Sequence, residues 1–140
     1  MRFLLIASLV TALAQEGQAP PASFRLIVHP QSQVTTLDRR FVEDAFLKKV
    51  KTWPTGEVIR PVDLEPESPT RRRFTEEVLR RPLAAVRAYW QQRIFSGRDV
   101  PPPELDSDQQ VIEYVMRYPG AVGYVSGGAT LNGPKAVVIR

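Results

Sequence analysis

Two kinds of hydrophobic pattern alternate along the chain. Short runs of apolar and β-branched residues predict β-strands at 24–29, 57–62, 121–126 and 136–139. Longer segments in which apolar residues recur every three or four positions predict α-helices at 38–50, 70–79, 82–96 and 107–118. Strands that alternate with helices predict an α/β fold. We expect a three-layer α/β sandwich with a mostly parallel or mixed central sheet, formed by a single domain over residues 24–140.

The same pattern predicts which side chains face inward. Strand centres and helix stripes together should form one hydrophobic core. In the helix that Pro82 begins and Gly97 ends, Leu83, Val86, Trp90 and Ile94 lie on one stripe. The expected core is Ile27, Val28, Phe41, Phe46, Ile59, Phe74, Val78, Leu83, Val86, Trp90, Val111, Val115, Val122 and Tyr124.

The first residues have the pattern of a secretory signal peptide. Arg2 precedes an apolar run from Phe3 to Leu13, and Ala12-Leu13-Ala14 fits the small-x-small rule for cleavage after Ala14. This run is shorter than the ~20 apolar residues that cross a bilayer. We therefore expect residues 1–14 to be removed, residues 15–23 to form a disordered tail, and the mature protein to be periplasmic or secreted without a membrane span.

Charge and composition exclude several classes of function. The formal net charge is +4, and it becomes +3 when Arg2, the one charged residue of 1–14, is removed. Export and the scatter of basic residues among acids argue against a nucleic-acid partner. The chain has no cysteine and one histidine, His29, so it offers no disulfide, no thiol nucleophile and no zinc-ligand spacing. We expect no catalytic residue, no metal site and no cofactor, and hence no enzyme.

One stretch has the composition of an anion site. Ser68 is a good N-cap for the helix that follows, and Pro69 suits its first turn because that position needs no N–H donor. Free backbone N–H groups, the hydroxyls of Ser68 and Thr70 and the arginines Arg71, Arg72 and Arg73 would then meet at one helix N-terminus, where an anion is favoured. A purely structural interpretation stays open, in which Ser-Pro-Thr caps the helix and the arginines are a solvated face.

The order of several motifs resembles a known family. They are Phe46 with Trp53 and Gly56, Arg60 with Asp63, Ser68-Pro69-Thr70, Tyr89-Trp90 followed by Phe95-Ser96-Gly97 and prolines, and Pro119-Gly120-Ala121-Val122-Gly123-Tyr124-Val125. In this order they resemble one lobe of the phosphate-binding receptors of ABC importers, in the type II periplasmic binding protein superfamily. They are similar above all to the small exported substrate-binding-like proteins with a PBP-like domain. The resemblance covers about residues 24–126.

The resemblance implies both a function and a site. The implied function is an exported solute-binding-like protein that recognises phosphate or a similar oxyanion and is linked to phosphate ABC transport. The implied ligand residues are Arg60, Asp63, Ser68 and Thr70, to which the arginine cluster adds Arg71. The expected partners are a small oxyanion and a transporter permease, a second copy or another envelope protein. The alternative is a non-catalytic interaction module that kept the lobe fold and lost its ligand.

Overall fold

The computed structural model describes residues 23–140. The expected signal peptide and all but the last residue of the expected tail lie outside the described residues. The strands are β1 (Phe24–Val28), β2 (Thr36–Leu37), β3 (Arg60–Pro61), β4 (Asp63–Leu64), β5 (Glu104–Leu105), β6 (Ala121–Ser126) and β7 (Lys135–Ile139). The helices are α1 (Arg39–Phe46), α2 (Pro69–Phe74), the π-helical turn η1 (Thr75–Leu79) that continues α2, α3 (Leu83–Phe95) and α4 (Asp108–Arg117).

The central sheet is mixed. Its strand order is β2-β7-β1-β6-β3, and β1 at the centre runs antiparallel to both β6 and β7. The two short edge strands are parallel to their neighbours, β2 to β7 and β3 to β6. Beyond β3 the chain leaves this sheet, and β4 pairs in parallel with β5 as a separate two-stranded ribbon. The predicted α/β class with a mixed sheet is confirmed.

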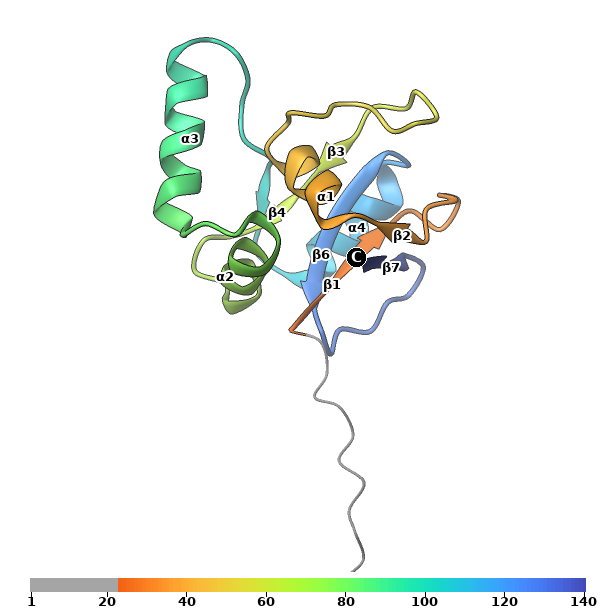
Figure 1. The fold of residues 1–140 in the computed structure, drawn as a ribbon. Helices are drawn as coiled ribbons and strands as arrows, with labels where there is room; N and C mark the ends of the chain where they lie inside the picture. The colour runs from red at the N-terminus through yellow and green to blue at the C-terminus, as the bar shows by residue number, and fades with distance from the viewer. Residues whose placement is uncertain (1–22) are drawn as a thin grey trace, which may run out of the picture.

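Helices cover both faces of the sheet (Figure 1). Successive residues of β6 point to opposite faces. Gly123 faces α4, where a Cβ added to it would lie 2.7 Å from a methyl group of Val111. Its neighbour Tyr124 faces the other way, and its ring stacks on Phe74 of α2 at a centroid distance of 4.0 Å. The result is the predicted three-layer arrangement, with α4 on one side and α1 and α2 on the other.

The hydrophobic core largely follows the predicted stripes. Twelve of the 14 expected residues are buried, and Phe41 is half-buried against Trp53. The exception is α3, whose stripe does not face the core along its whole length. Only Val86 and Trp90 of that stripe are buried, whereas Leu83 is half-buried and Ile94 is 52% exposed. The core prediction was wrong for Leu83, and Ile94 shares the stripe without being buried, because α3 stands at the side of the molecule (Figure 1) and its buried residues are Val86 and Trp90.

Several predicted boundaries also differ. The first helix ends at Phe46 instead of Val50, because Lys48 adopts a left-handed backbone (φ 55°) and turns the chain. The predicted strand 57–62 is mostly not in the sheet, since Val58 pairs with Thr52 in a local hairpin. The pairings of β2 and β5 were not predicted, and each of these strands has only two residues. Within residues 23–140, every helix is too short or too polar to span a membrane.

Candidate functional site

The helix N-terminus that the sequence singled out forms as expected. Ser68 has an extended backbone (φ −65°, ψ 127°), and its Oγ accepts a hydrogen bond from the Arg71 N–H at 3.3 Å. Its carbonyl accepts the Arg72 N–H at 3.1 Å. The predicted N-cap is therefore confirmed, and the Ser68 hydroxyl is committed to the helix.

Thr70 carries the hydrogen-bond donors at this helix N-terminus that the Ser68 cap does not use. Pro69 has no N–H, and the amides of Arg71 and Arg72 are bonded to Ser68. Neither the N–H nor the hydroxyl of Thr70 makes a hydrogen bond to any other residue of 23–140, and the side chain is half-buried. The start of α2 thus presents one backbone donor and one hydroxyl to a ligand.

The Arg71 side chain turns inward and joins Asp63, Glu104 and Tyr124 in a polar cluster. Its side chain is 7% exposed, its Nη1 donates to Glu104 at 2.8 Å and to the Leu64 carbonyl at 2.6 Å, and its Nε lies 3.6 Å from Asp63. Burial opposes the charge of Arg71, but the neighbouring Asp63 and Glu104 outweigh burial and hold its pKa above its usual value. The other two arginines, Arg72 and Arg73, are exposed.

Asp63, on β4, belongs to the same cluster. It is buried, and its Oδ1 accepts a hydrogen bond from the Tyr124 hydroxyl at 2.8 Å. Burial raises the pKa of Asp63 to about 6, although Arg71 and the Tyr124 hydroxyl act in the opposite direction. The Tyr124 oxygen in turn accepts a hydrogen bond from the Leu64 N–H at 3.2 Å. The cluster therefore joins β4, which carries Leu64, to β6, which carries Tyr124.

Arg60 lies apart from this cluster. It is exposed on β3, and its guanidinium sits 4.7 Å above the ring of Tyr118, which follows α4. Of the five predicted site residues, the structure brings Asp63, Ser68 and Arg71 into one bonded network and leaves Thr70 beside it. Arg60 is instead part of a cation–π pair.

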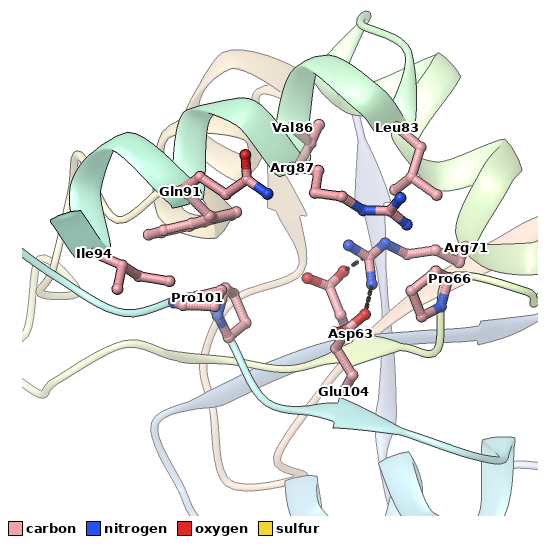
Figure 2. Close-up of a pocket in the computed structure, with 12 residues that line it drawn as sticks. Asp63, Pro66, Arg71, Leu83, Val86, Arg87, Gln91, Ile94, Pro101 and Glu104 are labelled. Carbon is pink, nitrogen blue, oxygen red and sulfur yellow. Dashed lines mark hydrogen bonds and ion pairs between the residues drawn. The ribbon is translucent and has the colours of Figure 1, made fainter.

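A cavity of about 180 Å³ opens beside the cluster, between α3 and the β4–β5 ribbon (Figure 2). Asp63, Arg71 and Glu104 form its polar end, and α3 forms much of the opposite wall. Glu104 was not among the predicted site residues, because its neighbours in the sequence do not point to Arg71. The pairing of β4 with β5, separated by about 40 residues, brings Glu104 to Arg71 and is not visible in a local pattern.

Metal binding finds no support in the part of the chain that the structure describes, where no group of three or more His, Asp or Glu side chains could hold an ion.

The fold formed by these elements matches part of several solved receptor structures. The chain matches a protein named as a phosphate ABC transporter substrate-binding protein, with bound phosphate, from Clostridium perfringens (TM-score 0.66, 22% identity). It also matches an ABC-type phosphate transport receptor from Vibrio cholerae (TM-score 0.60, 19% identity) and PstS from Borrelia burgdorferi (TM-score 0.65, 12% identity).

Each match covers 84% of this chain but only 44%, 46% and 47% of the respective receptor, so the chain spans less than half of their length. At these identities the likeness concerns the fold. No protein-family model matches the chain. No curated protein matches it in sequence either.

Proposed function

We propose that this chain is an exported, single-lobe solute-binding-like protein that recognises phosphate or a similar small oxyanion at the start of α2 and acts in phosphate ABC transport. It is a binding protein and not an enzyme, and it acts in the periplasm or outside the cell after cleavage behind Ala14. The observation on which the proposal depends is that the Thr70 N–H and hydroxyl, at a capped helix N-terminus, have no hydrogen-bond partner among residues 23–140. The helix dipole favours negative charge at that end.

The fold supports the same proposal. The receptors that share it are named for phosphate transport, and one was solved with phosphate bound. The exposed Arg72 and Arg73 add positive charge to α2. Arg71 is different, because its charge is balanced by Asp63 and Glu104 and its backbone N–H is bonded to the Ser68 hydroxyl. A transporter permease or a second copy would supply the wall that one lobe lacks.

A second candidate function follows from the bonds that the polar groups near α2 already make with one another. Two of the groups that would serve an anion are already bonded, the Ser68 hydroxyl to its own helix and the Arg71 guanidinium to two carboxylates. This favours an interaction module that kept the lobe as a scaffold and lost its ligand.

Backbone NMR of the purified chain separates the two functions. Addition of phosphate should shift the amide of Thr70 and its neighbours Ser68 and Arg71, and Arg60 also shifts if it belongs to the site. Thr70→Val should weaken these shifts, whereas Thr55→Val, at an exposed threonine in a distant turn, should leave them unchanged. Absence of shifts at tens of millimolar phosphate, with and without a candidate partner, would contradict the anion site and favour the interaction module.

A further inference from the structure

The cavity beside α3 is larger and more apolar than an inorganic anion requires. A cavity needs only about 10–15 Å³ to hold one water, so about 180 Å³ has room for several waters. Apart from its polar end and the amide of Gln91 on α3, its walls are apolar, from Leu83, Val86, Trp90 and Ile94 on α3 and from Pro101 and Pro102 in the segment that returns to β5. Phosphate would leave these walls in contact with water, whereas an apolar group would displace that water.

The polar end of the cavity presents both signs of charge. Two guanidinium groups, of Arg71 and Arg87, and two carboxylates, of Asp63 and Glu104, line it, so that their formal charges sum to zero. Figure 2 shows the guanidinium group of Arg87 next to that of Arg71, which lies beside the Asp63 carboxylate. A ligand with only a negative charge would be repelled by the two carboxylates, and a ligand with only a positive charge by the two guanidinium groups.

Both the cationic and the anionic side chains at this end have atoms that make no hydrogen bond within residues 23–140. Arg87 makes no ion pair and no hydrogen bond with any residue of 23–140, and the structure gives the Nη2 of Arg71 no hydrogen-bond acceptor in the same range. The contacts of Asp63 are made through Oδ1, and no hydrogen bond from the described residues reaches its Oδ2. The cavity therefore offers a cationic donor and an anionic acceptor at one end and an apolar surface at the other.

We propose that this cavity binds a small zwitterion with an apolar body, that is, an apolar α-amino acid. Its ammonium group meets Asp63, its carboxylate meets Arg87 and the free edge of Arg71, and its side chain packs against Trp90 and Ile94. The site and the ligand class differ from those of the proposed oxyanion function, and this inference does not depend on it.

L-leucine titrated into the purified chain, followed by NMR, tests the inference. We expect shifts at the Trp90 indole N–H and along α3. Three truncated ligands remove one feature each: 4-methylpentanoate lacks the ammonium group, 3-methylbutylamine lacks the carboxylate, and glycine lacks the apolar body. Each should bind at least tenfold more weakly than L-leucine, because each leaves one part of the cavity unmatched.

Three variants at exposed positions keep the test independent of folding. Arg87→Ala should weaken L-leucine at least tenfold, whereas Arg73→Ala, at an exposed arginine outside the cavity, should not. Ile94→Trp should fill the cavity and abolish the shifts. Equal affinity for L-leucine and either single-charge analogue would overturn the inference, as would shifts confined to Thr70 or an absence of shifts at tens of millimolar L-leucine. Phosphate shifts at Thr70 that persist in Arg87→Ala would show that the two sites are separate.

Discussion

Arg71 holds two carboxylates at the inner end of the cavity, and its replacement should be costly. Arg71→Met leaves Asp63 buried without its counter-charge, and breaking a buried pair on one side typically costs about 3–5 kcal/mol. Arg72→Met, at the exposed neighbouring position, should change the free energy of unfolding by less than about 0.5 kcal/mol. Denaturant unfolding at neutral pH measures both. A loss below about 1 kcal/mol for Arg71→Met would mean that the cluster is not a coupled unit.

Asp63 should titrate well above an ordinary aspartate. Its pKa is raised from 3.8 to about 6 by burial, and the side-chain carboxyl carbon shift should have its midpoint near that value. The folded chain then binds this proton more tightly than the unfolded chain does. The stabilising contribution of Asp63 is complete below a pH of about 4 and is lost as the pH rises through about 6.

Asp63→Asn removes this pH dependence. The free energy of unfolding of the wild type minus that of the variant should fall between pH ~4 and pH ~7, by up to about 3 kcal/mol. A carboxyl midpoint below 4, or a difference that rises over this range, would show that Arg71 outweighs burial.

At the scale of elements, a few contacts attach α3 to the rest of the molecule. One substitution tests how much they contribute to the free energy of unfolding. Val86 and Trp90 are its buried residues, and the Tyr89 hydroxyl donates to the Leu47 carbonyl at 2.7 Å. Trp90→Ala should cost about 3–5 kcal/mol, as large-to-small core changes do. Phe95→Ala is the matched control, because Phe95 is 96% exposed. The free energy of unfolding measures both. A melting temperature of Trp90→Ala within a degree or two of the wild type would mean that Trp90 contributes little to the fold.

The elements that the sequence predicts well are those with local causes. The Ser68 cap, the start of α4 and strand β6 depend on neighbouring residues and lie where the pattern placed them. The inward turn of Arg71 depends instead on Asp63 and Glu104, which a pairing distant in sequence brings together. The exposure of Ile94 depends on how α3 docks, because a helical stripe indicates which residues share a face but not what that face touches.

At the scale of the whole molecule, the chain matches less than half of the length of the phosphate receptors in fold. An anion at the start of α2 meets one free amide and one hydroxyl and stays half solvated, so its hydrogen bonds compete with water at high dielectric. We expect a dissociation constant on the order of a millimolar, about 4 kcal/mol of binding free energy, unless a second copy or a partner closes the site.

The measurement that tests the central claim most directly is a phosphate titration of the purified chain by calorimetry at two salt concentrations. The account predicts millimolar binding that weakens when salt is added, because exposed charges are screened, and that weakens further in Thr70→Val. No binding at tens of millimolar phosphate, or binding that Thr70→Val leaves unchanged, would contradict an oxyanion site at the start of α2.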